Sequence, residues 1–281
     1  MRSQNFLSNK PLLYLVATPI GNLQDLSPRA KEIIEQADFI ACEDTRVSGL
    51  LISNLGFKKP LISLREHNEV SEANYVVEQI LSGKKVVYMS DAGYPAISDP
   101  GSKLVQIALE HCINVSVIPG PNAGLSALVA SGLNTDHFYF HGFLSPKESQ
   151  RNEELRKLAT REETLIFYEA PHRIMKTLES LYEILGNRRA CIARELTKKH
   201  EEYIRMNLEE MIALDPESLK GEMVIVVEGC LKEVSDSIDD KEIINLVNNF
   251  ESMGISTKDA IKKVSELTKV SKNYIYKIYH N

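Results

Sequence analysis

The chain has 281 residues, 43% of them hydrophobic and 26% charged, a composition typical of a globular protein long enough for two domains with separate cores. No apolar run approaches the roughly 20 residues that a membrane-spanning helix needs, so a membrane protein is not expected. The formal net charge of −6 argues against nucleic-acid binding through overall charge, although it leaves room for a local basic surface.

Strands and helices alternate from residue 12 to about residue 120. Short β-branched apolar runs predict strands over 12–17, 38–42, 61–64, 86–90 and 114–118. The segments between and after them predict helices over 28–37, 46–54, 70–82, 101–111 and 122–132, the first of them started by Ser27 and Pro28. This alternation predicts an α/β fold whose mainly parallel sheet is covered by helices on both faces.

Three loops rich in glycine or proline follow predicted strands, at residues 18–22, 90–101 and 119–124. Ligands of open parallel sheets bind just beyond the carboxyl ends of the strands, so these loops predict a small-molecule cleft; plain turn chemistry is the alternative. The first loop has one glycine where a dinucleotide-binding protein would carry G-x-G-x-x-G, and the chain has no P-loop motif. We therefore expect a ligand without phosphate.

The pattern changes near residue 135. Predicted strands at 138–143, 164–168, 189–194, 202–206 and 222–228 are closely spaced, with helices expected within 144–163 and over 171–185. Gly142 interrupts the first of these strands. Short connections of this kind predict a mixed or antiparallel sheet in a second domain. The resulting division is an N-terminal domain over 1–133, a second α/β domain over 134–232 and a helical tail over 233–281.

The tail is predicted to contain helices over 239–252, 256–267 and 271–279. Ser256 with Asp259 resembles a capping box, and Ser271 can cap the last helix. Residues 256–281 hold six lysines against two acidic residues, a net charge of +4 in a chain of −6. The last two helices have the spacing of a helix-turn-helix. Lysines beside tyrosines favour an RNA-docking module, and a dimerisation or lid helix pair is the alternative.

The four cysteines, Cys42, Cys112, Cys191 and Cys230, form no C-x-x-C pair and lie in or beside strand-like runs. They are interpreted as reduced core residues, and no metal site is expected. Reduced cysteines of this kind predict a cytoplasmic protein, and the N-terminus has no signal-peptide cleavage pattern.

Seven long motifs resemble a known family. In chain order they are VATPIGNLQDLSPRA, ACEDTR, SDAGYPAISDPG, PGPNAG, FYFHGFLSPK, FYEAPHR and RELTKKHEE, and they extend from about residue 11 to residue 230 without a large gap. The chain is similar to the tetrapyrrole methylase superfamily, and within it to the small-subunit ribosomal RNA methyltransferases. Its basic helical tail also resembles the extra C-terminal domain of bacterial members.

The resemblance implies an enzyme that uses S-adenosylmethionine to methylate the ribose 2′-hydroxyl of one cytidine in the decoding region of 16S rRNA, within the small ribosomal subunit. It implies two α/β domains with the folded cofactor bound between them, and a homodimer. A phosphate-free ligand at strand ends, which the residues themselves predict, suits this cofactor.

The family's cofactor cleft is built from the three loops and from the facing backbone of the second domain. Carried over by position, the resemblance points to Pro19, Asp91, Ile97, Ser98, Asn122, Ala123, Tyr168, Ala170 and Ala193. Asp91 could accept a hydrogen bond from the cofactor or simply cap the next turn, and Asn122 could simply cap a helix.

Methyl transfer to an alcohol needs no metal, because the sulfonium is already activated. The protein must align the hydroxyl with the methyl group and accept the hydroxyl proton. The candidates are Asp44, Arg46, Glu66, His67, Glu169, His172 and Arg173. Asp44 could instead pair with Arg46 and cap a helix, and His67 could be a surface histidine, so no single base is preferred. Phosphate contacts are expected from Arg46, Arg65, Lys147, Arg151, Arg173, Arg194, Lys198 and Lys199.

Two other functions compete with rRNA methylation. One is another methyl transfer of the same superfamily, to a corrin or porphyrin precursor or to a protein side chain; a tetrapyrrole enzyme would not need a basic tail. The other is a non-catalytic ribosome-assembly factor that retains the cofactor fold, against which the charged residues expected around the cleft argue.

Overall fold

The computed structural model describes residues 12–65, 68–230, 239–268 and 270–280. The chain folds into two compact units, Met1–Gly229 and Cys230–Asn281. Each unit is described by itself.

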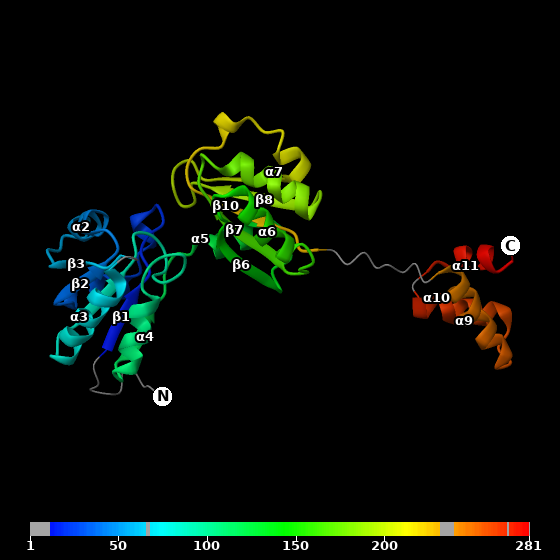
Figure 1. The fold of residues 1–281 in the computed structure, drawn as a ribbon, viewed down its shortest axis with the longest axis horizontal. Helices are drawn as coiled ribbons and strands as arrows, with labels where there is room; N and C mark the ends of the chain where they lie inside the picture. Colours follow the sequence, from blue (N-terminus) through cyan, green and yellow to red (C-terminus); the bar gives the residue numbers. More distant parts are fainter. Residues whose placement is uncertain (1–11, 66–67, 231–238, 269, 281) are drawn as a thin grey trace. The chain divides into compact units, whose positions relative to one another are not determined.

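The first sheet of the larger unit is wholly parallel. Its strands are β1 (Leu12–Val16), β2 (Phe39–Cys42), β3 (Leu61–Ser63), β4 (Val86–Met89) and β5 (Asn114–Ile118). They lie in the order β3-β2-β4-β1-β5. Figure 1 labels β1, β2 and β3 of this sheet. Because β2, β4, β1 and β5 are neighbours, the loops that follow these four strands meet at one edge of the sheet.

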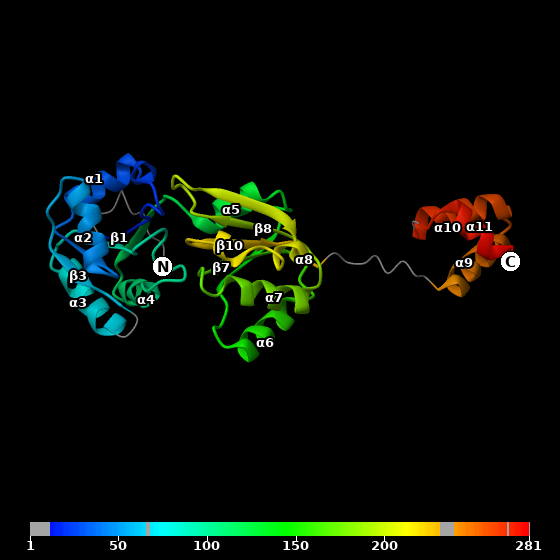
Figure 2. The same cartoon turned by 90° about the horizontal axis from the view of Figure 1, so that it is seen from above.

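Helices cover both faces of this sheet, as predicted. A 3₁₀ turn at Leu23–Asp25 (η1) precedes α1 (Pro28–Gln36), and α2 (Thr45–Asn54) follows β2. α1 and α2 bury Ile34 and Ile52 against one face. α3 (Glu69–Leu81) and α4 (Ser102–Glu110) bury Val76 and Leu104 against the other face, so the helices form two layers (Figure 2). Ser27 accepts a hydrogen bond from the Ala30 amide, which confirms the predicted start of α1.

The second sheet is mixed, which agrees with the sequence. It contains β6 (Phe138–Phe143), β7 (Thr164–Glu169), β8 (Arg189–Arg194), β9 (Glu202–Asn207) and β10 (Met223–Val227), in the order β6-β7-β10-β8-β9. Only β6 and β7 are parallel; the other pairs are antiparallel. The predicted break in β6 is a register shift between Phe140 and Gly142.

Helices also cover both faces of the second sheet. α6 (Glu148–Leu158) and α7 (Ile174–Leu185) bury leucines on one face, where the short helix α8 (Leu208–Met211) joins them; a 3₁₀ turn, η3 (Pro216–Ser218), precedes β10. α5 (Ala123–Ser131) packs Ala127 and Leu128 on the opposite face. α5 therefore follows the first sheet in the sequence but packs on the second. The predicted division of the larger unit at residue 133 stays a prediction.

The smaller unit is a cluster of three helices with its own core. α9 (Asp240–Ser252), α10 (Thr257–Thr268) and α11 (Lys272–Tyr279) bury Ile243, Val247, Val264 and Ile275 together. Ser271 caps α11 by accepting a hydrogen bond from the Tyr274 amide. At the start of α10 the Ser256 hydroxyl accepts from the Asp259 amide and donates to the Asp259 carboxylate, so the predicted capping pair forms.

Two expectations need correction. The helix expected from residue 171 begins at Ile174, because Glu169 binds the Ala170 amide and holds the 170–173 segment as a turn. Cys112 is exposed rather than buried: it lies in the turn after α4 with φ of 57°. No helix among the described residues is long and apolar enough to cross a membrane.

Candidate functional site

The loops after β1, β4 and β5 are bonded to one another. Thr18 and Gly93 exchange two backbone hydrogen bonds of 2.9 and 3.0 Å, and the Thr18 hydroxyl donates to the Ser90 carbonyl. The Gly120 amide donates to the Tyr94 hydroxyl at 3.2 Å. These contacts join the three sequence-predicted loops into one rigid edge of the first sheet.

Glycine is needed where these loops meet other backbone. A Cβ at Gly120 would stand 3.0 Å from both the Cβ and the carbonyl oxygen of Ala17. A Cβ at Gly21 would stand 2.9 Å from the Leu196 carbonyl oxygen, in the turn after β8. Gly21, the lone glycine of the first loop, thus allows that loop to touch the second sheet's turn.

The loop after β4 also contains two non-glycine residues with positive φ, Ala96 at 66° and Ser98 at 61°. Such backbone costs free energy and is typical of functional loops. Gly142, in the bulge of β6, faces this loop, because a Cβ there would lie 2.9 Å from the Ser98 hydroxyl. The loop is therefore held between the edges of the two sheets.

A cavity of about 440 Å³ opens among these loops and the edge of the second sheet. Its volume is in the range of small-molecule sites. Aromatic and apolar side chains, including Tyr94, Phe143 and Tyr168, line much of it. The structure brings seven of the nine predicted cofactor residues into this wall: Asp91, Ile97, Ser98, Asn122, Ala123, Tyr168 and Ala170.

The other two predicted cofactor residues lie just outside the wall. Pro19 is half-buried beside Ile20, which does line the cavity. Ala193, in β8, is fully buried under α5, and it pairs with Val224, which lines the cavity. Asn122 caps α5 through the Leu125 amide at 2.8 Å, and the Tyr168 hydroxyl accepts from the Gly124 amide at 3.2 Å.

A second cavity of about 670 Å³ adjoins the first and is lined mainly by charged side chains. Four residues, Glu43, Asp91, Ser98 and Asp99, belong to the walls of both cavities. Three carboxylates therefore stand where a ligand in one cavity would meet a ligand in the other. Of these three, the sequence had predicted only Asp91.

Burial raises the pKa values of all three carboxyl groups, and neighbouring carboxylates add to the rise. Desolvation raises the pKa of Asp99 to about 6, and the negative charge of Asp91 adds to this rise. Desolvation is also the main cause of the raised pKa of Glu43 and of Asp91. Asp99 belongs to the second Ser-Asp pair of the loop after β4, a repeat that could have been noticed in the sequence.

Asp44 is held in a different way. Its carboxylate caps α2 through the Arg46 amide at 2.8 Å, pairs with the Arg46 guanidinium and lies 3.4 Å from the guanidinium of Arg65. The hydrogen bonds from Arg46 hold the pKa of Asp44 well below its usual range. The capping interpretation of Asp44 therefore describes the structure, and an acid this strong is a poor proton acceptor.

Glu169 lies in the cavity wall, but its carboxylate is fully buried and already bonded to other groups of the protein. It accepts hydrogen bonds from the Ala170 amide at 2.8 Å and from the Thr177 hydroxyl, and its oxygen lies 3.2 Å from Arg173 Nε. Arg173 also donates to the Leu144 carbonyl. These contacts shape the E-A-P-H-R turn, whereas His172 in the same turn is exposed.

Replacing Glu169 by Gln should lower the free energy of unfolding by about 2–3 kcal/mol, because the half-buried Arg173 loses its anionic partner and one buried acceptor oxygen becomes a donor. Glu163→Gln is the matched control, because Glu163 forms a more exposed pair with Arg161 and should cost less than about 1 kcal/mol. Urea unfolding measures both. Equal small losses would show that the Glu169 contacts do not organise the turn.

Glu66 and His67 lie outside the described residues. Several arginines and lysines expected on phosphates are engaged within the protein instead. Arg151 is buried and donates to Ser180, Arg194 pairs with Glu202, and Lys198 pairs with Glu195 and Glu222. Arg65 is exposed in the wall of the charged cavity, and Arg46 is exposed beside it on Asp44. Lys147 and Lys199 are exposed elsewhere.

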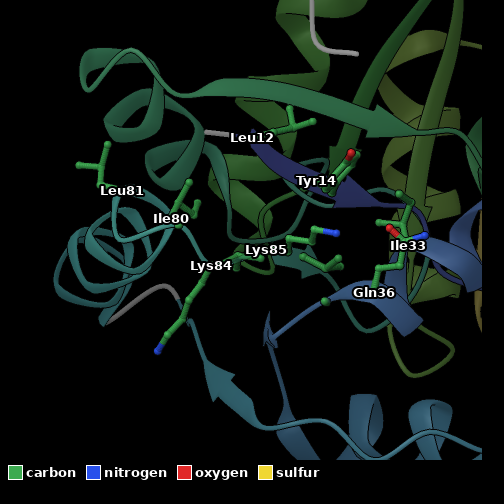
Figure 3. Close-up of a pocket in the computed structure, with 12 residues that line it drawn as sticks. Leu12, Tyr14, Ile33, Gln36, Ile80, Leu81, Lys84 and Lys85 are labelled. Atoms are coloured by element: carbon green, nitrogen blue, oxygen red, sulfur yellow. The ribbon is translucent and has the colours of Figure 1, made fainter. Parts of the chain in front are cut away.

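A third cavity of about 310 Å³ lies at the opposite edge of the first sheet, where the strands begin (Figure 3). Leu12 and Tyr14 of β1 and Ile33 and Gln36 of α1 contribute to it, and Lys85 extends toward Tyr14 in the close-up. None of the predicted site residues among the described part of the chain lines this cavity.

Solved structures share the fold of the larger unit. The methyltransferase CobJ matches 79% of this chain and 95% of its own length with a TM-score of 0.60 at 20% identity. Diphthine synthase matches 78% of this chain and 89% of its own with a TM-score of 0.60 at 16% identity. At these identities the likeness concerns the fold.

Curated relatives are far more similar. The ribosomal RNA small subunit methyltransferase I of Bacillus subtilis is 41% identical over 99% of this chain and 97% of its own length. The protein of the same name from Pasteurella multocida is 44% identical over 94% of this chain and 95% of its own. Both alignments extend over the smaller unit as well as the larger one.

The family model described as tetrapyrrole (corrin/porphyrin) methylases matches residues 12–212. The predicted two-sheet fold is confirmed, and so is the predicted cofactor, since the enzymes of this family are S-adenosylmethionine-dependent methyltransferases. The chain belongs to the tetrapyrrole methylase family, in the branch of the small-subunit ribosomal RNA methyltransferases I.

Proposed function

We propose that this chain methylates 16S rRNA of the small ribosomal subunit, at the ribose 2′-hydroxyl of a cytidine in the decoding region. The coarser part, methyl transfer to small-subunit rRNA, is supported by the near full-length identity to enzymes of that name. The junction of the two cavities, where carboxylates stand between a cofactor-sized space and an open, charged one, supports transfer to a hydroxyl group. The cytidine and the decoding region are proposed from the family resemblance.

The apolar cavity fits S-adenosylmethionine in size and chemistry. Tyr94, Phe143 and Tyr168 offer ring surface for an adenine, and Asn122 and Ala123 line the same cavity. Asp91 and Glu43 carry charge opposite to that of the cofactor's ammonium and sulfonium groups. When bound, the cofactor supplies a methyl group activated by a positively charged sulfur.

Asp99 is the proposed proton acceptor. The hydroxyl oxygen forms a bond to the methyl carbon as the carbon–sulfur bond breaks, and the hydroxyl proton passes to the Asp99 carboxylate. The product is a methyl ether and a neutral thioether. A base with a pKa near 6 is mostly ionised at neutral pH and still accepts a proton readily.

The charged cavity is the proposed place of the nucleotide. Arg65 and Arg46 lie on its rim beside Asp44 and could contact the phosphate next to the methylated ribose. Asp44 holds the two guanidinium groups in place and thereby acts as a positioning residue. We also propose that the enzyme is a cytoplasmic homodimer and that its substrate is the assembled small subunit.

Calorimetry tests the cofactor half of the proposal directly. The purified protein should bind S-adenosylmethionine, and Ala123→Phe should weaken binding at least tenfold because its ring fills the cavity wall beside Asn122. NAD should not bind, since the loops lack a pyrophosphate cradle. Tight binding of NAD without a response to S-adenosylmethionine would overturn the assignment.

A further inference from the structure

The smaller unit buries most of its apolar residues, and two of its tyrosines are hydrogen-bonded within it. The Tyr279 hydroxyl contacts Asn248 and Glu251 on α9 at 2.7 Å, and the Tyr274 hydroxyl contacts Asp240 at 3.1 Å. α11 is thus fastened to α9, with Ile275 completely buried beneath it. The three helices lie side by side in both views (Figures 1 and 2). This packing fixes which side of α11 faces the solvent.

The solvent side of α11 carries Lys272, Asn273, Tyr276, Lys277 and His280, which we call the α11 face. All five residues are exposed, and Tyr276 is 60% exposed. Lys272, Tyr276 and His280 follow one another at intervals of four, and Asn273 and Lys277 do the same, so the five share one face of the helix. The rings of Tyr276 and His280 are 4.3 Å apart between centroids.

The α11 face contains no carboxylate, although the whole chain has a net charge of −6. The segment 256–281 carries +4, so the rest of the chain carries −10 (−6 minus +4). RNA phosphates are repelled by such an acidic body and attracted by a local cationic surface. The paired aromatic rings beside the lysines add a surface on which unstacked bases can lie.

We propose that the α11 face binds single-stranded RNA, with Lys272 and Lys277 on phosphates and the Tyr276–His280 pair stacked on bases. The inference deepens the proposed function and rests on it in one respect, that the substrate is an RNA. Near the cleft, Arg46, Arg194 and Lys198 are paired with carboxylates. The α11 face would supply the unpaired cations that a polyanionic substrate needs. A docking surface of this kind raises affinity without taking part in methyl transfer.

The test uses the full chain and a fluorescein-labelled single-stranded 12-nucleotide RNA of mixed sequence, with binding followed by fluorescence anisotropy from 50 to 200 mM KCl. Lys272→Glu with Lys277→Glu should raise the Kd at least tenfold and lower the slope of log Kd against log salt by about 0.7 per lost phosphate contact. Tyr276→Ala should raise the Kd about fivefold and leave that slope unchanged.

Lys58→Glu with Lys176→Glu is the matched control, because both lysines are exposed on the larger unit and the change in net charge is the same. It should leave the Kd and the salt slope close to those of the wild type. Unchanged binding in the α11 variants, or an equal loss in the control, overturns the proposal. The proposal is also overturned if light scattering shows that the α11 variants differ from the wild type in molecular mass while their RNA affinity is unchanged. That result would make the α11 face a protein interface.

The outcomes keep this inference separate from the proposed function. If the α11 variants bind RNA like the wild type while the wild type methylates small-subunit rRNA, docking on α11 fails and the function stands. If RNA binding depends on the α11 face but no rRNA is methylated, the docking surface stands and the proposed function fails.

Discussion

Asp99→Asn should lower the rate constant of methyl transfer at least a hundredfold at pH 7.5, because the amide cannot accept the hydroxyl proton. Removing a general base typically costs two to four orders of magnitude. The affinity for S-adenosylmethionine should change much less, since the aromatic wall of Tyr94, Phe143 and Tyr168 remains intact. Single-turnover transfer from labelled cofactor measures the first quantity, and calorimetry measures the second.

The wild-type rate should also depend on pH through this group. Asp99 must be ionised to act, and its pKa is about 6, so the rate should fall about tenfold per unit below pH 6 and level off above it. Asp91 and Glu43 face the same junction, and desolvation raises the pKa of each, so their charges couple to the ionisation of Asp99. The Asp99→Asn enzyme should lose this dependence.

Asp99→Asn should raise the free energy of unfolding although it lowers the rate of methyl transfer. The pKa of Asp99 is higher in the folded chain, about 6, than in the unfolded chain, about 3.9, so the folded state binds the proton more tightly. The contribution of Asp99 to stability is therefore greatest below pH 4 and falls as the pH rises to 6. Asp99→Asn should raise the free energy of unfolding by on the order of 1 kcal/mol at pH 7.5, after allowance for solvent screening, and should change nothing below pH 4.

Asp136→Asn provides a control for the chemistry of the substitution, since Asp136 is an exposed residue before β6. It should alter neither the rate nor the pH profile. An Asp99→Asn enzyme with an undiminished rate and the wild-type pH profile would show that another group takes the proton.

Gly101→Ala should lower the free energy of unfolding of the larger unit by about 3 kcal/mol. Gly101 has φ of 127°, which side chains rarely adopt, and a Cβ there would overlap the ring of Tyr88. Tyr88 is completely buried and donates to the Pro100 carbonyl at 2.7 Å, so its ring cannot move aside cheaply. Scanning calorimetry follows the unfolding of this unit.

Gly132→Ala separates the effect of the backbone angle from that of the overlap. Gly132 also has a positive φ, 78°, but a Cβ there would meet open space. Gly132→Ala should lower the free energy of unfolding by only about 1 kcal/mol. Equal losses in the two variants would mean that Tyr88 does not restrain the loop after β4.

The fold follows largely from local pattern. Apolar runs such as Val86–Met89 and Asn114–Ile118 are too short for helices and are bounded by turn residues, so strands and their alternation with helices could be read from the sequence. α5 shows the limit of that reading. The local sequence does not indicate that Ala127 and Leu128 pack on the second sheet rather than the first, because this packing depends on contacts between distant segments.

The candidate site could be predicted in part for the same reason. Strand-end loops must meet at one edge of a parallel sheet, which predicts that Asp91 and Asn122 lie close together, and both line one cavity. Tyr168, which lines the same cavity, is predicted by the family resemblance and not by this rule. The sequence offered pairing of Asp44 with Arg46 as one of two alternatives but could not choose between them. It gave no sign that Arg65 joins this pair or that Glu169 is buried under α7, since both depend on side-chain contacts. It also gave no reason to prefer Asp99, whose raised pKa comes from burial and from Asp91.

The central claim is methyl transfer to a ribose of the small subunit's rRNA. The most direct measurement incubates the purified chain with labelled S-adenosylmethionine and either assembled small subunits or naked 16S rRNA, each from cells that lack this protein, and maps ribose methylation along the RNA. We predict one methylated 2′-hydroxyl, on a cytidine of the decoding region, formed on assembled subunits and poorly on naked rRNA. Label that appears only on a tetrapyrrole precursor or a ribosomal protein, or on no acceptor despite cofactor binding, would contradict the account.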